Sequence, residues 1–137
     1  MSFYHLNTRI YQYTANIATN TNQNEYKIEE KSVVEGRRLR GIWTRTGGKG
    51  FQNKDLINTN AFNGTFLTLQ EDQTNVIEKI PLANILKANE NGRPYYVNMG
   101  KIEMSETEIY ISNMADIVNG EVIELTFDFE KDQNGRQ

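Results

Sequence analysis

The segment that most constrains the fold is GEVIELTFDFEK, residues 120–131, because apolar and polar residues alternate strictly along it from Ile123 onward. The apolar positions are Ile123, Leu125, Phe127 and Phe129, and the polar positions are Glu124, Thr126, Asp128 and Glu130. Successive side chains of a strand point to opposite faces, whereas a helix would scatter these apolar residues around its axis. We therefore expect a strand over residues 121–130, with one face in a core and an acidic face in water.

Seven other segments carry similar patterns and are separated by turn-forming residues. They are residues 3–13, 26–34, 38–45, 65–70, 75–80, 95–102 and 108–113. In residues 38–45, alternation places Leu39 and Trp43 on a common face, which we assign to the core, and Arg38 and Arg40 on the opposite face. About eight short strands at this spacing predict an all-β, antiparallel sandwich or barrel.

The connections contain recognisable turn and helix signals. Asn-Gly dipeptides occur at residues 63–64, 91–92, 119–120 and 134–135, and we expect turns with a positive φ there, because glycine has no Cβ to clash. One short helix is expected in PLANILKAN, residues 81–89, because Pro81 is suited to a helix start. Its buried side would consist of Leu82, Ile85 and Leu86.

Two polar stretches are expected to be loops, residues 14–24 and 46–64. The first is rich in Asn and Thr, and the second is long enough to suggest a functional or partner-ordered connection. A chain of 137 residues is long enough for one domain. We divide it into an N-terminal strand or arm with its polar loop (1–24), a β-sandwich domain (25–130) and a polar C-terminal tail (131–137).

The stretch GRRLRGIWTRTGGKG, residues 36–50, holds five cations and no acid. It is not a phosphate-binding loop of the Walker type, because Gly50 follows Gly48-Lys49 where Ser or Thr is required, and Trp43 stands where the first glycine belongs. Nucleic-acid binding is disfavoured because the whole chain is acidic, with a pI of about 5.2. We interpret the stretch as a strand and a loop whose cations face a partner.

The sequence offers few parts for catalysis, so we expect no enzyme, no cofactor, no metal site and no small-molecule substrate. Cysteine is absent, His5 is the only histidine, and no G-x-S-x-G nucleophile motif occurs. The carboxylates Glu103, Glu106 and Glu108 are more simply a solvated surface than a glycosidase pair or a calcium site. No apolar run approaches the roughly 18 residues of a membrane span, and the first residues do not resemble a secretory signal.

Aromatic residues leave a second class of function open, a carbohydrate-binding or adhesion module. Flat amphipathic rings stack on sugars, and six residues are candidates for such contacts: Tyr11, Tyr13, Tyr95, Tyr96, Tyr110 and Phe51. Strand alternation assigns about half of them to the core, because neighbours such as Tyr95 and Tyr96 face opposite sides. Binding of glycans by an isolated monomer would favour this alternative.

Charge is distributed unevenly along the chain, whose net charge is -3. Residues 1–61 carry a net charge of +4 and residues 62–137 carry -7. In one compact domain, such a division can place opposite charges on different faces, which favours contact between copies. The alternative is that folding interleaves the two halves and cancels the charge separation, and the sequence does not give the strand order that would decide between them.

The run TFLTLQEDQTNVIEKIPLANIL, followed by EIYISN and GEVIELTFDFEK within residues 65–130, resembles the penton or minor capsid-type structural proteins of tailless icosahedral bacteriophages. The resemblance implies a single jelly roll that assembles side by side with its neighbours, and it transfers no functional residue. We therefore expect a virion protein made in the host cytoplasm, with copies of itself and other virion proteins as partners. Its partner-binding residues would be the cations Arg37, Arg38, Arg40, Arg45 and Lys49, which meet Glu124 and Asp128 of an adjacent copy.

Overall fold

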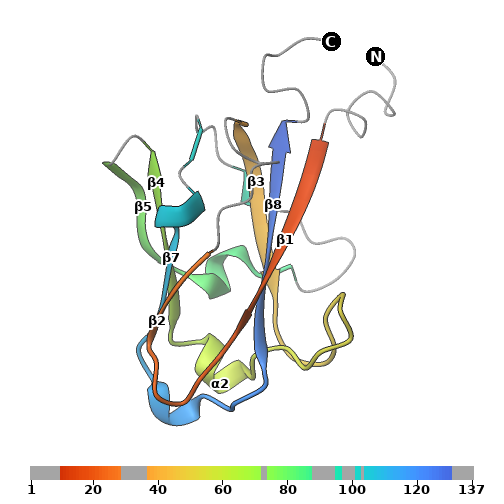
Figure 1. Cartoon of the computed structure of the whole chain (residues 1–137), viewed down its shortest axis with the longest axis vertical. Coiled ribbons are helices and arrows are strands. Elements are labelled where there is room, and N and C mark those ends of the chain that lie inside the picture. The colour runs from red at the N-terminus through yellow and green to blue at the C-terminus, as the bar shows by residue number, and fades with distance from the viewer. Residues whose placement is uncertain are drawn as a thin grey trace.

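The computed structural model describes residues 10–28, 37–71, 74–87, 95–96, 101–102 and 104–130. The described chain forms two four-stranded antiparallel sheets that face each other (Figure 1). Sheet A contains β1 (Ile10–Ala18), β3 (Leu39–Arg45), β6 (Tyr95–Tyr96) and β8 (Val122–Glu130). Sheet B contains β2 (Glu25–Lys27), β4 (Thr65–Glu71), β5 (Thr74–Pro81) and β7 (Glu108–Ile111). The predicted all-β sandwich is confirmed.

The strand order identifies the sandwich as a single jelly roll. Sheet A has the order β1-β8-β3-β6 and sheet B the order β2-β7-β4-β5. The antiparallel pairs are therefore nested, with β1 on β8, β2 on β7, β3 on β6 and β4 on β5. This is the pattern produced when one long hairpin is rolled into two sheets, and it defines the eight-stranded jelly roll.

The core lies between the sheets and is filled by the inward side chains of the central strands. Phe127 and Phe129 of β8 are fully buried there, as are Leu67 and Leu69 of β4. The ring of Phe127 stacks on Phe129 with centroids 6.0 Å apart, and Tyr13 of β1 lies 6.4 Å from Phe127 on its other side. Alternation in the sequence correctly marked these apolar positions as core.

The expected water-facing acidic side of β8 is wrong for most of the strand. Every residue from Val122 to Phe129 is buried, including the polar residues Glu124, Thr126 and Asp128. The reason is the central position of β8, which has β1 on one side and β3 on the other. The polar side chains meet partners on the outer surface of sheet A, as Thr126 does when its hydroxyl lies 2.9 Å from that of Thr14.

A β-bulge in β3 reverses the expected direction of Trp43. Leu39 pairs with Phe129 and Gly41 pairs with Asp128, so Arg40 is an extra residue that shifts the register. Leu39 faces the core as predicted, but Trp43 lies opposite Thr126 and shares its outward face. Trp43 is buried, yet it lies on the outer surface of sheet A and is not part of the core.

Strand limits differ from the expected ones mainly near the N-terminus. The predicted loop 14–24 is wrong in its first part, because β1 continues to Ala18 and pairs with β8 along its whole length. A backbone that can complete a ladder with a central strand satisfies its hydrogen bonds there, whatever its polar side chains. Residues 3–9, 29–34 and 97–100 of the predicted strands lie outside the described residues.

The helical elements are short turns at the ends of strands. A 3-10 turn, η2 (Leu82–Ile85), occurs where one helix was predicted, and Leu82 and Ile85 are buried between the sheets. Leu86 was predicted to be buried but is exposed, because the chain leaves the helical turn there and becomes extended. Three further helical turns were not predicted: α2 (Thr59–Phe62), η3 (Met104–Glu106) and η4 (Met114–Asp116). Within the described residues, no helix is both long and apolar enough to cross a membrane.

The two described Asn-Gly dipeptides use glycine for different reasons. Gly120 has a φ of 96°, as predicted for a turn. Gly64 has no positive φ, so that expectation is wrong there, but a Cβ at Gly64 would overlap the side-chain amide of Asn113. The amide is held in place because its Nδ2 donates to the carbonyl of Asn60 and to Asp116 Oδ2. The dipeptides at 91–92 and 134–135 lie outside the described residues.

The contact at Gly64 predicts the effect of a single methyl group. Gly64→Ala should lower the free energy of unfolding by about 1–3 kcal/mol, because the added Cβ displaces a hydrogen-bonded amide. Urea unfolding monitored by circular dichroism measures this change. The double variant Gly64→Ala with Asn113→Ala should lose less than the two single losses added together, and simple additivity would contradict the proposed contact.

Candidate functional site

The loop between β3 and α2 contains a compact hairpin, residues 46–57, which we call the hairpin loop. Its two arms are joined by a hydrogen bond from the Leu56 amide to the Gly48 carbonyl, 2.9 Å, and by an ion pair of 2.9 Å between Lys49 and Asp55. Gly47 and Gly48 both have a positive φ, which lets the chain turn sharply after β3. The hairpin loop projects from the end of β3, at the lower right of Figure 1.

The buried carboxylate of Glu124 attaches the hairpin loop to sheet A. Arg45, the last residue of β3, lies beside Glu124 of β8, with Nη2 2.7 Å and Nε 2.8 Å from Oε1 of the carboxylate. The second oxygen, Oε2, accepts a hydrogen bond of 2.6 Å from the backbone amide of Phe51. Glu124 is only 1 % exposed. Its carboxylate therefore connects β8, which carries it, with β3 and with the hairpin loop.

Glycine at position 50 is required by the close approach of the hairpin loop to this carboxylate. A Cβ at Gly50 would lie 2.5 Å from Glu124 Oε2 and 2.7 Å from a methyl carbon of Leu56. The backbone of the hairpin loop can therefore come within hydrogen-bonding distance of Glu124 only without a side chain at this position.

Phe51 is an exposed aromatic residue held in a fixed place. Its ring is 64 % exposed, whereas its backbone amide is bonded to Glu124 as described above. The guanidinium of Arg45 lies 4.1 Å from the centre of the ring, within the range of a cation–π contact. The ring is therefore exposed to solvent while the backbone that carries it is held in place by a hydrogen bond.

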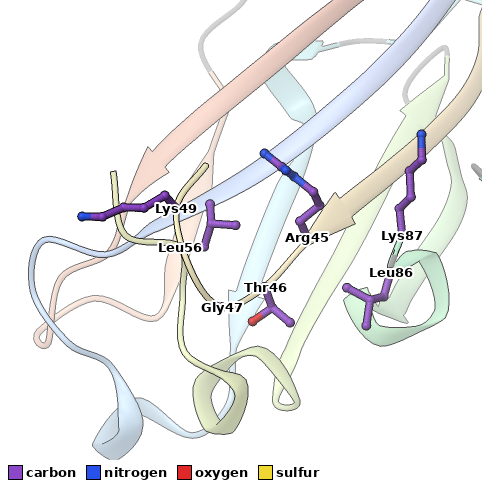
Figure 2. Close-up of a pocket in the computed structure, with 7 residues that line it drawn as sticks. All are labelled: Arg45, Thr46, Gly47, Lys49, Leu56, Leu86 and Lys87. Carbon is purple, nitrogen blue, oxygen red and sulfur yellow. The ribbon is translucent and has the colours of Figure 1, made fainter. Parts of the chain in front are cut away.

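A pocket of about 320 Å³ lies beside the hairpin loop. Seven residues line it: Arg45, Thr46, Gly47, Lys49, Leu56, Leu86 and Lys87. Figure 2 shows Arg45 at the end of β3, with Lys49 and Leu56 on one side of it and Leu86 and Lys87 on the other. Leu86 and Lys87 are placed here because the backbone after η2 joins the edge of β3, where the Lys87 amide donates to the Thr44 carbonyl at 2.8 Å.

We call this region the hairpin surface and define it by Arg45, Lys49, Phe51, Leu86 and Lys87. Leu86 is 36 % exposed, so the region presents two exposed apolar residues, Leu86 and Phe51, among three cations. The acids that offset these cations are Glu124, which is buried, and Asp55. The surface thus combines an apolar contact area with three cations, of which Arg45 and Lys49 are paired with acids of the same chain.

The outer surface of sheet A continues from the hairpin surface into a second group of polar residues around Asp128. The ammonium of Lys87 lies 4.6 Å from the centre of the Trp43 ring. Asp128 is 7 % exposed, and its Oδ1 has no hydrogen-bond partner among the described residues. Burial raises the pKa of Asp128 from 3.8 to about 6, although the side chain of Gln12 and the charge of Lys87 act in the opposite direction.

The structure divides the predicted partner-binding cations into two groups at opposite ends of β3. Arg45 and Lys49 belong to the hairpin surface. Arg40 forms an ion pair of 2.6 Å with Glu130, and Arg37 donates to the Glu130 carbonyl at 3.1 Å and lies 5.0 Å from the ring centre of Tyr11. Arg38 is exposed, and its backbone forms an isolated antiparallel β-bridge with that of Lys101.

The two predicted acidic partners, Glu124 and Asp128, are both buried in the chain that carries them. The cation that meets Glu124 is Arg45 of the same chain. Acids that could meet another copy must therefore be found elsewhere on the surface.

The other candidate residues are dispersed. Tyr11 and Tyr13 pack against the core, and Tyr110 is half-buried on the outer face of sheet B. Glu106 pairs with Lys27 at 3.3 Å. The part of the chain described here contains no group of three or more His, Cys, Asp or Glu residues arranged to hold a metal ion. His5, Glu103 and the side chains of Tyr95 and Tyr96 lie outside the description.

Two contacts of the site were not predicted from the sequence, and the reasons differ. Asp55 is the only acid in residues 36–64, so its pairing with a nearby cation such as Lys49 could have been inferred. The contact of Lys87 with Trp43 joins residues far apart in the chain and depends on the path of the backbone after η2. No local sequence pattern predicts this contact.

Comparison of the chain with protein-family models, with curated proteins and with solved structures gives no significant match.

The role of Glu124 as an attachment point predicts a specific loss. Glu124→Gln should lower the free energy of unfolding by about 1–3 kcal/mol, because Arg45 loses its charged partner in a buried position. Hydrogen exchange of the Phe51 amide should become faster, since this amide bonds to the carboxylate. Glu130→Gln, which alters the more exposed pair with Arg40, is the matched control and should cost only about 0–1 kcal/mol. Equal losses in the two variants would contradict the assignment.

The raised pKa of Asp128 predicts a pH-dependent stability. Because the folded-state pKa of about 6 exceeds the ordinary 3.8, the folded protein retains a proton in this interval that the unfolded chain releases. This stabilisation is complete below about pH 4 and is lost as the pH rises through 6. Asp128→Asn should therefore be more stable than the parent protein at about pH 7.5, and the difference should shrink towards about pH 4. Urea unfolding at both pH values tests this, and a constant difference would contradict it.

Proposed function

We propose that the protein is a structural assembly protein, a jelly-roll subunit that associates with copies of itself or with neighbouring subunits of a protein shell. On this proposal it is a virion component, of the capsid, penton or minor capsid type, made in the host cytoplasm. The observation that carries the proposal is Phe51, a largely exposed aromatic ring on a hairpin loop whose backbone is bonded to the buried carboxylate of Glu124.

A rigid exposed ring is well suited to bind another protein. Burying a phenylalanine side chain contributes about 1.5–3 kcal/mol, and a side chain already held in place loses little conformational entropy on binding. The guanidinium of Arg45 contacts the Phe51 ring, and Arg45 also lines the pocket together with Leu86, so a partner that covers Phe51 and this pocket buries apolar surface of both residues. Aromatic residues and arginine are the types most enriched in the energetic centres of interfaces.

The fold and the charge distribution are consistent with assembly. Jelly rolls form virus capsids, but the same fold also serves in lectins and cupins, so it does not select a function by itself. The fold interleaves the basic first part, +4, and the acidic second part, -7, and pairs Arg40 with Glu130 and Arg45 with Glu124 within the chain. The charges that stay exposed, and not the division along the sequence, are therefore the ones that can meet a neighbouring copy. Charged contacts at an interface mainly set orientation and association rate, while buried apolar area supplies most of the affinity.

A specific observation also favours the alternative, a carbohydrate-binding or adhesion module. On the outer face of sheet B, Phe66 of β4 and Tyr110 of β7 lie directly opposite each other, and both are half-buried. The ammonium of Lys79 lies 5.4 Å from the ring centre of Tyr110. Neighbouring aromatic residues on the outer face of a sheet are candidates to stack on a sugar ring.

The assembly proposal predicts that Phe51→Ser weakens association. The dissociation constant should rise by at least about tenfold, because the loss of a buried aromatic contact exceeds about 1.4 kcal/mol. Sedimentation velocity over a range of protein concentrations, with and without the neighbouring subunits, measures this effect. Tyr110→Ser is the matched control on the other sheet and should leave association unchanged.

Two results would decide against the assembly proposal. The first is a parent protein that remains monomeric at every concentration, also in the presence of its neighbouring subunits. The second is glycan-array binding by this monomer that Tyr110→Ser abolishes and Phe51→Ser preserves, which would favour the carbohydrate-binding alternative.

A further inference from the structure

The largest stretch without any cation lies near the end of the described chain. Residues 102–130 contain eight acids and no Lys, Arg or His. Several of these acids are engaged within the chain, among them Glu106 with Lys27, Glu124 with Arg45 and Glu130 with Arg40. An acid that meets another copy must be exposed and must lie on a surface that can make contact.

Residues 114–121, which we call the acidic turn, meet both conditions. The segment begins with η4 and carries Asp116, which is exposed, and Val118, which is 51 % exposed. Among the described residues, the large apolar side chains that are exposed are Phe51, Leu86 and Val118. Two of them belong to the hairpin surface, and the third lies two positions after an exposed carboxylate.

The acidic turn is held rigidly by hydrogen bonds from neighbouring segments. The hydroxyl of Thr19 donates to the Val118 carbonyl at 3.1 Å, and the amide of Thr21 donates to Asn119 Oδ1 at 2.8 Å. The side-chain amide of Asn58 donates to the Asp116 carbonyl at 2.9 Å. Asp116 and Val118 are therefore presented to solvent on a braced backbone, as Phe51 is on the hairpin loop.

The two surfaces are complementary in charge and in apolar character. The hairpin surface offers three cations around two exposed apolar side chains, and the acidic turn offers a carboxylate beside one. Within one chain they do not cover each other, because Phe51 and Val118 both remain more than half exposed. The acidic turn, directly before β8, and the hairpin loop both lie towards the lower end of the sandwich in Figure 1. Two copies that meet through this end could form the contact reciprocally, as in a two-fold dimer.

We propose that the hairpin surface of one copy binds the acidic turn of a second copy, with Val118 packed against Phe51 and Leu86 and with Asp116 facing the cations. This inference rests on the proposed assembly function and assigns it a partner and a contact. The apolar contact supplies affinity, and Asp116 selects the orientation, since charge complementarity chiefly determines register and association rate.

Charge reversal on each side of the contact provides the test. Lys49→Glu and Asp116→Lys should each raise the dissociation constant of self-association by at least about fivefold, because an attraction at the interface becomes a repulsion. An equal mixture of the two variants should recover the parent affinity, since the new carboxylate of one variant then faces the new ammonium of the other. Sedimentation equilibrium of the purified full chains measures all three samples. Recovery in the mixture cannot arise from a change in the stability of either variant.

Two further variants control this experiment. Lys27→Glu makes the same charge change at another exposed lysine that also has an acid partner, Glu106, and it should leave self-association unchanged. Val118→Ser should weaken self-association without any change of charge. Circular dichroism confirms that each variant is folded.

The outcomes separate this inference from the proposed function. If the parent protein self-associates but the charge variants do not weaken it, or their mixture does not recover, the contact is wrong while the assembly function stands. If the parent protein binds only other virion subunits, the proposal that a second copy binds the hairpin surface is wrong, and the assembly function again stands. A parent protein that is monomeric under all these conditions overturns both.

Discussion

The carboxylate of Glu124 is the interaction on which the geometry of the candidate site depends. It takes the guanidinium of Arg45 on one oxygen and the amide of Phe51 on the other, while it is almost fully removed from water. Removing a charge from water is costly unless it is paired and hydrogen-bonded, and both conditions are met here. One partner comes from β3 and the other from the hairpin loop. The contacts that compensate the buried charge of Glu124 therefore also fix the position of Phe51.

Around β8, the outer surface of sheet A buries polar residues as thoroughly as apolar ones. Trp43, Thr126 and Asp128 share this face. These buried polar groups differ in whether they have a hydrogen-bond partner. Thr126 has the hydroxyl of Thr14 beside it, whereas one oxygen of Asp128 has no partner among the described residues and the pKa of this carboxyl is raised.

The sequence predicts the fold class and most strand positions because alternation is a local signal. β3, β4, β5 and β8 lie within one or two residues of their predicted limits. The direction of the Trp43 side chain could not be predicted. The bulge at Arg40 turns the residues after it to the other face of the sheet, and the apolar pattern of the sequence does not reveal the bulge. The pair of Arg45 and Glu124 spans 79 residues and exists only because β3 and β8 are neighbours, and strand order is not a local property. The helical turn α2 did have a signal, because Asn58 is a good N-cap residue and its side chain accepts from the Ala61 amide.

The nested strand order also governs how this chain can be made. β8 is the last described strand, yet it lies in the middle of sheet A, and its contact between Thr14 and Thr126 joins residues 112 apart. During synthesis, β1 and β3 emerge from the ribosome without the strand that must separate them, so sheet A cannot close until residue 130 is available. Such long-range pairing is slow because most of the loop-closure entropy is lost before the contacts form. The unpaired edges of β1 and β3 are therefore exposed throughout translation, which is when a nascent chain of this topology is most prone to pair with the wrong strand.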